Sequence, residues 1–269
     1  GGANLTDASL GSANLTGVVS GGIIGTPWSL PDVWALVNGY LVGPSANLTN
    51  ANLTNANLSG ANLTGANFTS ANMYAAHFDN ADLSNANLTG VFLLSTNLTG
   101  ANLSGVVSGG IIGTPSALPA GWALVNGYLV PTFTVTFDAN GGTTPSPTTI
   151  TVLYNATYGT LATASRPCYA FNGWFTESIG GTEITSTSAV GITSNQTLYA
   201  QWTAINYNYT ETIAACGSYE WHGNTYTSSN NTATWTGQNA AGCDSIVTLD
   251  LTITPFTVNT TTIAACDSY

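Results

Sequence analysis

A five-residue alternation of apolar and polar positions dominates the first half of the chain. From Ala46 to Gly105, twelve consecutive units follow the pattern Ala-Asn-Leu-Thr/Ser-X, with Phe68, Met73 and Phe78 in place of leucine in three of them. A period of five fits neither an α-helix nor a simple strand, whereas a short fixed repeat is typical of a solenoid whose units bury their apolar side by stacking. We therefore expect the Leu and the small Ala to point inward, and the Asn, the Thr and the fifth residue to face solvent.

These units resemble the pentapeptide-repeat family, and the resemblance covers residues 1–130. It implies an all-β fold for a first domain at 1–131: a right-handed quadrilateral β-helix with four units in each coil, each coil rising by about 4.8 Å. The twelve units then make three coils, and residues 3–17 supply three units of an earlier coil. Both ends of the sequence fall inside repeats, so we expect a window on a longer repetitive protein. The resemblance is specific for the fold and leaves the function open.

Two near-copies of one segment interrupt the ladder, at residues 17–45 and 105–130. Each contains the sequence Trp-Ala-Leu-Val-Asn-Gly-Tyr-Leu-Val, and an Asn-Gly pair tolerates the positive φ angles of a two-residue hairpin turn. We predict that each segment is a hairpin insert folded against the β-helix, with a Trp packed near a Tyr. These aromatics form either a plug over the solenoid, which is the simpler interpretation, or a platform that binds carbohydrate. They are Trp34, Tyr40, Trp122 and Tyr128.

Residues 132–204 carry a different pattern, with strand-like alternation from Phe133 into a Gly-rich turn at Gly141 and Gly142. The opening Val-Thr-Phe-Asp-Ala-Asn-Gly-Gly, the central Tyr-Ala-Phe-Asn-Gly-Trp and the final Leu-Tyr-Ala-Gln-Trp resemble the Listeria–Bacteroides (internalin B-type) repeat. The resemblance implies a small β-grasp-like module that serves as a spacer in bacterial surface proteins. Cys168 departs from the family pattern, because a Gly is common at its position, and whether it has a disulfide partner is left open.

Residues 205–255 contain Ile-Ala-Ala-Cys-Gly-Ser-Tyr-Glu-Trp at 213–221 and Ala-Gly-Cys-Asp-Ser at 241–245, and residues 256–269 start a further copy with Thr-Ile-Ala-Ala-Cys-Asp-Ser-Tyr. These motifs resemble the Cys-Asp-Ser-Tyr tandem repeats of long secreted proteins from Bacteroidetes-like bacteria. A module of about fifty residues buries little surface, and a disulfide is the usual remedy. We expect a small β module closed by a disulfide between Cys216 and Cys243. Cys266 restarts the motif, so its partner is expected beyond Tyr269. Such cysteine usage implies an oxidising compartment.

The composition excludes several partners. The chain of 269 residues has one basic residue, Arg166, and 12 acidic ones, for a net charge of −11, yet only 5% of its residues are charged. Phosphate binding and attachment to an anionic membrane surface both need clustered Lys and Arg, so neither nucleic acid nor such a surface is an expected partner. No stretch approaches eighteen apolar residues, and membrane insertion is not predicted.

No constellation of side chains points to catalysis, to a metal site or to a cofactor, and we do not expect an enzyme. His77 occupies an Asn position of the ladder, and His222 follows Trp221, so both are interpreted as surface residues. Asp79 and Asp82 lack the pairing that acid–base chemistry needs and the dense Asp/Gly spacing of a calcium-binding repeat.

Fifteen Asn-x-Thr/Ser sequons are glycosylation candidates. The repeat consensus generates such sequons for structural reasons, but a charge-poor exposed chain also favours attached sugars, so both readings stay open, as do O-linked sugars on Thr and Ser. Ten lie in the ladder units, namely Asn4, Asn14, Asn47, Asn52, Asn57, Asn62, Asn67, Asn87, Asn97 and Asn102, and five lie beyond them, namely Asn155, Asn195, Asn208, Asn230 and Asn259.

Taken together, these features predict an extracellular, cell-surface protein that is a structural or adhesive stalk or forms a filament. Solenoid ends present unpaired strand edges, so end-to-end self-association is expected. The alternative is an adhesin module that binds carbohydrate or a host protein through the exposed aromatics. Mimicry of DNA, which some pentapeptide proteins use, requires an acidic outer face, whereas the outer positions here are Asn, Thr and Gly.

Overall fold

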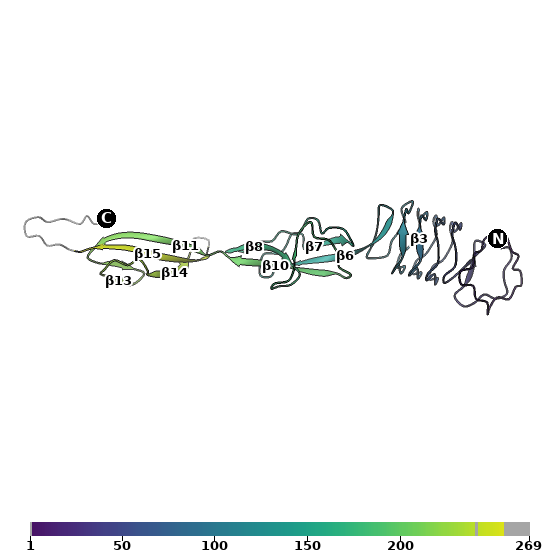
Figure 1. Cartoon of the computed structure of the whole chain (residues 1–269), viewed down its shortest axis with the longest axis horizontal. Coiled ribbons are helices and arrows are strands. Elements are labelled where there is room, and N and C mark those ends of the chain that lie inside the picture. Colours follow the sequence, from purple (N-terminus) through teal and green to yellow (C-terminus); the bar gives the residue numbers. More distant parts are fainter. Residues whose placement is uncertain (1, 240–241, 256–269) are drawn as a thin grey trace, which may run out of the picture. The chain divides into compact units, whose positions relative to one another are not determined.

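In the computed structural model, which describes residues 2–239 and 242–255, every regular element is a β-strand (Figure 1). The chain divides into two compact units. The first holds the residues up to Thr134 together with Thr151–Thr157 and Ala189–Asn195, and the second holds the other described residues. Each unit is described below by itself.

The ladder is built from parallel bridges between residues twenty positions apart. Asn47 bridges Asn67, which in turn bridges Asn87, and the backbone bonds are short: Leu48 N donates to Asn67 O at 2.7 Å, and Asn67 N donates to Ala46 O at 2.9 Å. Twenty residues hold four units, so each turn of the ladder, called a coil below, has four sides. Only one side reaches strand length, where β3 (Asn87–Thr89) pairs in parallel with β4 (Val107–Gly109).

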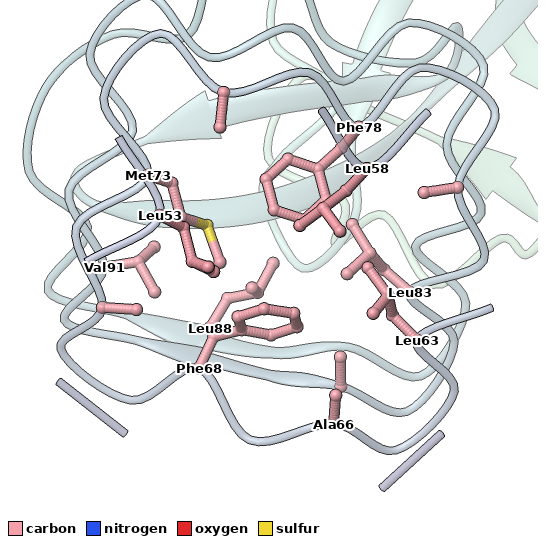
Figure 2. Close-up of a cluster of buried hydrophobic side chains, with 14 of the residues drawn as sticks. Leu53, Leu58, Leu63, Ala66, Phe68, Met73, Phe78, Leu83, Leu88 and Val91 are labelled. Carbon is pink, nitrogen blue, oxygen red and sulfur yellow. The ribbon is translucent and has the colours of Figure 1, made fainter. Parts of the chain in front are cut away.

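The interior of the coils is filled by the predicted residues. Leucine at the central position is at most 3% exposed from Leu48 to Leu103, and Phe68, Met73 and Phe78 are equally buried. Figure 2 shows these side chains converging from the sides of the coil, and Phe68 meets Phe78 edge to face with their ring centroids 5.9 Å apart. The inward orientation of the Leu column is therefore confirmed.

The five-residue spacing of the parallel bridges continues into the first part of each predicted insert, as far as Ser29 and Ala117, so the interruption is confined to the later residues, which contain the hairpins. The parallel bridges use backbone atoms alone, and apolar residues can therefore replace the Asn of the consensus without breaking the stack. Only the hairpins leave it. The bridges concerned are Asn4–Ile24, Ser9–Ser29, Val19–Asn47, Phe92–Ile112 and Asn97–Ala117.

Both predicted hairpins are confirmed. The first pairs β1 (Ala35–Val37) with β2 (Tyr40–Val42), and the second pairs β5 (Trp122–Val125) with the start of β6 (Tyr128–Asp138). Their turns have positive φ at both central residues: 50° and 80° at Asn38 and Gly39, and 49° and 79° at Asn126 and Gly127. Asn and Gly are the residues that tolerate this geometry.

The next module is one mixed sheet in the order β5-β6-β10-β8-β9, with β7 also paired to β6 (Figure 1). β10 runs parallel to β6 and antiparallel to β8. The remaining bounds are β7 (Thr149–Leu153), β8 (Tyr169–Phe175), β9 (Glu183–Ile184) and β10 (Gln196–Ala204).

Two tryptophans of the sequence motif hold this sheet to its loops. The Trp174 ring packs on Phe137 with centroids 4.6 Å apart, and its Nε1 donates to Ala162 O at 2.8 Å. Trp202 Nε1 donates to Ala139 O at 2.9 Å, and its ring lies so close to Gly142 that a Cβ there would clash with it. The Asn-Gly-Gly turn is thus fixed by a tryptophan sixty residues later in the sequence.

The last described module is a three-stranded sheet in which β15 (Asp244–Thr254) lies between β11 (Tyr207–Cys216) and β14 (Thr234–Gln238). β11 is parallel to β15, and β14 is antiparallel to it. A small hairpin of β12 (Tyr219–Trp221) and β13 (Asn224–Tyr226) completes it. Trp221 is buried with Val247, Leu249 and Leu251.

The predicted disulfide between Cys216 and Cys243 was wrong, because Cys243 is bonded to Cys168 instead, with 5.3 Å between the two Cα atoms. In the parallel pairing of β11 with β15, Cys216 stands opposite Thr254, whereas Cys243 precedes Ser245 at the other end. Roughly nine residues at about 3.3 Å each, or about 30 Å, therefore separate the two levels. Cys216 is itself disulfide-bonded, and Cys266 lies outside the described residues.

Candidate binding surfaces

The Asn-x-Thr segments of the ladder serve the turns of the coil. In the unit at Asn47, the side-chain Oδ1 accepts hydrogen bonds from Thr49 N at 3.2 Å and from Thr49 Oγ1 at 2.7 Å. The same pair of bonds recurs from unit to unit, for example at Asn87, where Thr89 N and Oγ1 donate at 3.0 and 2.7 Å. The Asn-x-Thr pattern that creates a sequon therefore also makes the hydrogen bonds that close the turn. These bonds explain the pattern structurally, whether or not sugars are attached.

The candidate glycosylation sites differ in accessibility. The expectation that every ladder Asn faces solvent was too broad, because Asn47, Asn62, Asn67, Asn87 and Asn97 are half-buried. Asn230 is also half-buried, and Asn259 lies outside the described residues. The exposed candidates are Asn4, Asn14, Asn52, Asn57, Asn102, Asn155, Asn195 and Asn208.

Three titratable side chains lie on two successive units of the ladder. His77 bridges between Asn57 and Asn97 and is exposed, and its Nδ1 lies 3.6 Å from Asp79 Oδ1. Asp82 accepts bonds from Ser84 N at 3.0 Å and from Asn102 Nδ2 at 3.1 Å. Within residues 2–239 and 242–255, no group of three or more His, Cys, Asp or Glu side chains has the arrangement of a metal site.

Hydrogen bonds lower the pKa of Asp82. The Ser84 side chain contributes most and the Ser84 backbone N–H next, while partial burial acts in the opposite direction and Thr64 and Asn102 add smaller effects. A carboxylate that accepts several donors is stabilised in its charged form. The hydrogen bonds thus favour the charged form of the Asp82 carboxyl group in this turn.

The hairpin aromatics lie mostly against the coils. Trp34 and Trp122 are half-buried against the ladder core. The Tyr40 ring lies on Gly21, and its hydroxyl accepts a hydrogen bond from Asn52 N at 3.1 Å. Tyr128 lies on Gly109 in the same way but is 54% exposed. Of the four, Tyr128 presents the largest accessible surface to a ligand.

A shallow groove in the last module was not anticipated from the sequence. It has a volume of about 350 Å³ and crosses the three-stranded sheet, lined by the exposed rings of Tyr207, Tyr209 and Trp235. The His222 ring stacks on Trp235 at 4.0 Å. The Tyr-x-Tyr spacing at the start of β11, which places both rings on one face of a strand, was the signal available. Amide groups of Asn208 and Gln238 lie beside the rings.

The described residues contain no helix of the length and apolarity that a membrane crossing requires.

Two family models match parts of the chain. Residues 46–85 and 76–106 match pentapeptide repeats, in eight copies, and residues 133–201 match the Listeria-Bacteroides repeat domain. Both resemblances inferred from the motifs are thereby confirmed within these bounds. The module that follows lies outside both matches, and no curated protein matches the chain.

Two solved structures are similar to part of the chain. One is the pentapeptide repeat protein Rfr23 from the cyanobacterium Cyanothece 51142, with 30% identity over 28% of this chain and a TM-score of 0.22. The other is HetL, a pentapeptide repeat protein involved in heterocyst differentiation regulation from Nostoc sp. strain PCC 7120, with 26% identity over 42% of this chain and a TM-score of 0.18. The chain spans 58% of the length of each.

Proposed function

We propose that this chain is a segment of an extracytoplasmic structural stalk, made of tandem β modules and without catalytic activity. In this proposal the ladder is a right-handed quadrilateral β-helix, followed by a β-grasp-like spacer and a small β module. The observation that carries the proposal is the disulfide between Cys168 and Cys243, because it joins two successive modules instead of closing one of them.

The joint between these modules is connected twice. Only Ile205 and Asn206 separate β10 from β11, and Ile205 N donates to Cys168 O at 2.9 Å, beside the disulfide. A module joined to its neighbour by one flexible linker rotates freely, whereas a short linker plus a cross-link restricts that rotation. Stiffness between modules is what a stalk needs and what a soluble enzyme does not require.

The backbone conformation at Cys168 is a further argument that the disulfide has a function. Its φ is +67°, in the left-handed region, where a side chain costs about 1–2 kcal/mol relative to glycine. The backbone conformation at this position favours glycine, and the disulfide explains why a cysteine is present there instead. Disulfides persist in oxidising compartments, and the Listeria-Bacteroides repeat supports the same location.

Pulling on the two ends of the chain by single-molecule force spectroscopy tests the stalk. We expect discrete unfolding events at measurable force, and the segment between the two cysteines, which are 75 positions apart, should stay inside the cross-link. Adding a reductant should lengthen the extended chain by at least roughly 250 Å, at about 3.3–3.6 Å per residue for the Cys168–Cys243 loop, since the disulfide at Cys216 opens as well. Extension of the chain without force peaks, or an unchanged length after reduction, would contradict the proposal.

A second candidate function is carbohydrate binding at the groove of Tyr207, Tyr209 and Trp235. Exposed aromatic faces beside amide groups offer a sugar both a stacking surface and oriented hydrogen bonds. Glycan-array binding should be lost in Trp235→Ala. The matched control is Trp28→Ala, since Trp28 is an exposed tryptophan of the ladder region that does not line this groove. Equal loss in both variants, or no binding by the parent chain, excludes this candidate.

A further inference from the structure

Arg166 is the single basic residue of the chain, which has 12 acidic ones. Its guanidinium group has no carboxylate within salt-bridge distance, and none of its N–H groups donates a hydrogen bond to any residue that the structure describes. A guanidinium carries five N–H donors in a planar fork, and it binds anionic partners more strongly than neutral ones. The one basic side chain of a protein with a net charge of −11 is therefore available to a ligand.

Two contacts hold the guanidinium in position. Its Cζ atom lies 3.8 Å from the centroid of the Tyr169 ring, which is a cation–π contact, and its Nη1 atom would lie 3.4 Å from a Cβ at Gly141. Tyr169 is the first residue of β8, and Gly141 belongs to the Asn-Gly-Gly turn, so a strand and a fixed turn support the group. A side chain that is already oriented loses less conformational entropy when a ligand binds to it.

A hollow of about 240 Å³ opens beside this guanidinium. Its volume is smaller than the roughly 300–1,000 Å³ of a pocket for a drug-sized ligand, so it has room for about one sugar ring. The indole N–H of Trp202 already donates to Ala139 O, so this tryptophan offers a ligand only the apolar surface of its ring. Apart from Arg166, the residues that line the hollow are Asn140, Ser178, Ile179, Gln201 and Trp202.

Asn140 and Gln201 supply two hydrogen-bond acceptors to the same hollow. Asn140 Nδ2 donates to Ser178 O at 2.9 Å and to Ala200 O at 3.0 Å. Gln201 Nε2 donates to Gly180 O at 2.6 Å. Because each amino group donates to backbone carbonyl oxygens, the orientation of both amides is defined and each side-chain oxygen is left over. Neither oxygen accepts a hydrogen bond from the part of the chain that the structure describes.

We propose that this hollow binds a hexuronate, which is a sugar ring that carries a carboxylate. The carboxylate pairs with Arg166, because the planar fork of the guanidinium matches two carboxylate oxygens. Ring hydroxyl groups donate to Asn140 Oδ1 and Gln201 Oε1, and the C–H face of the sugar packs on the Trp202 ring. This site is separate from the aromatic groove of the last module.

Other classes of ligand use these groups less completely. A phosphate monoester carries a charge of about −1.5 to −2 at pH 7, which one guanidinium offsets only in part, and the net negative charge of the chain repels it further. A neutral sugar leaves the guanidinium unpaired. An Asp or Glu side chain of a peptide supplies the carboxylate but has no hydroxyl groups for the two amide oxygens. A hexuronate engages the charge, both acceptors and the aromatic ring at once.

An NMR titration of the nitrogen-labelled chain tests the site, with the Arg166 Nε–H and Trp202 Nε1–H signals as local probes. The methyl glycosides of glucuronic and galacturonic acid are added, each compared with its neutral parent, methyl glucoside or methyl galactoside. At least one uronide should shift both signals saturably, with a dissociation constant of about 1 mM, and its neutral parent should bind at least roughly tenfold more weakly. No shift of these signals, or equal affinity for charged and neutral sugars, overturns the proposal.

Two variants separate the guanidinium fork from its charge. Arg166→Gln should weaken uronide binding at least roughly tenfold, and Arg166→Lys, which keeps the charge and loses the fork, should weaken it by roughly three- to tenfold, both followed on the Trp202 signal. The matched control is Asn57→Asp, which lowers the net charge by the same amount as Arg166→Gln but at an exposed position of the ladder. Equal weakening in the control overturns the site. Circular dichroism melting checks that each variant is folded.

Two further ligands test the assignment to a sugar acid. The α-amide of N-acetylglutamic acid offers the carboxylate without the sugar, and glucose 6-phosphate offers a phosphate monoester. If either binds as tightly as the uronide, the site takes an acidic peptide or a phosphate, and the proposal is wrong. The result is independent of the stalk, because a chain that binds the uronide but extends without force peaks keeps this site and loses the stalk.

Discussion

The fifth residue of each unit carries the conformational demand of the coil. Its φ is +55° to +69° at Asn55, Gly60 and Ser70, in the left-handed region that glycine and, less readily, asparagine adopt. This explains why Gly and Asn predominate at a position that the repeat pattern alone marks only as variable and outward-facing. Side-chain chemistry matters less at this position than the absence or tolerance of a Cβ.

Substitutions at Ala75 and Gly60 test in opposite directions whether the positive φ of the fifth residue favours glycine. Ala75 has φ of +51°, so Ala75→Gly should raise the free energy of unfolding by about 1 kcal/mol through relief of backbone strain. Gly60 has φ of +69° and open space around it, so Gly60→Ala should lower it by a similar amount, about 1 kcal/mol, without any clash. Denaturant titration of both variants measures these changes, and shifts of the same sign would contradict the explanation.

Asp82 makes the stability of the ladder depend on pH in acid. Its pKa in the folded state is lowered, chiefly by the Ser84 side chain, so the carboxylate stabilises the fold above the unfolded-state pKa of about 3.9. That stabilisation is lost as the pH falls through the lower, folded-state pKa. Asp82→Asn keeps the acceptor oxygen that Asn supplies in other units, so its stability should fall less between pH 5 and pH 2. Denaturant titrations across this range would contradict the assignment if both proteins lost stability equally.

At the scale of elements, the sequence predicts local geometry well and long-range pairing poorly. The five-residue period places Leu53 and Leu58 inside, and the Asn-Gly pairs place both hairpin turns, because each of these features depends on neighbouring residues only. The pairing of Cys243 depends on the parallel register of β11 and β15, which are joined through a long connection and which no local pattern specifies. For the same reason the groove around Trp235, assembled from three strands, was not predicted.

The Asn-Gly-Gly turn is an element whose second glycine is required by a distant ring. A Cβ at Gly142 would clash with the Trp202 ring and with the carbonyl oxygen of Ser165, so Gly142→Ala should lower the free energy of unfolding by about 1–3 kcal/mol. The control is Gly191→Ala, where a Cβ meets no atom and φ is not positive, and its effect should be within about 0.5 kcal/mol. Similar losses in both variants would show that the Trp202 contact does not constrain the turn.

At the scale of the whole molecule, the Cys168–Cys243 disulfide links the stability of two successive modules. Closing a loop of 75 residues is worth about 4 kcal/mol in the chain-entropy account. Replacing both cysteines should therefore destabilise the fold by up to about that amount and should expose the connection at Ile205 and Asn206 to proteases. Limited proteolysis with mass spectrometry locates the cut, and a connection that stays resistant would show that packing alone holds the joint.

The choice of replacement at Cys168 separates the cross-link from the backbone strain. Cys168→Gly with Cys243→Ala removes the disulfide and also relieves the φ of +67°, whereas Cys168→Ala with Cys243→Ala removes the disulfide and keeps the strain. The glycine variant should therefore be more stable by about 1 kcal/mol, as judged by denaturant titration under oxidising conditions. If the two double variants are equally stable, the left-handed backbone conformation at Cys168 does not destabilise the fold. The disulfide would then not be needed to offset backbone strain at this cysteine.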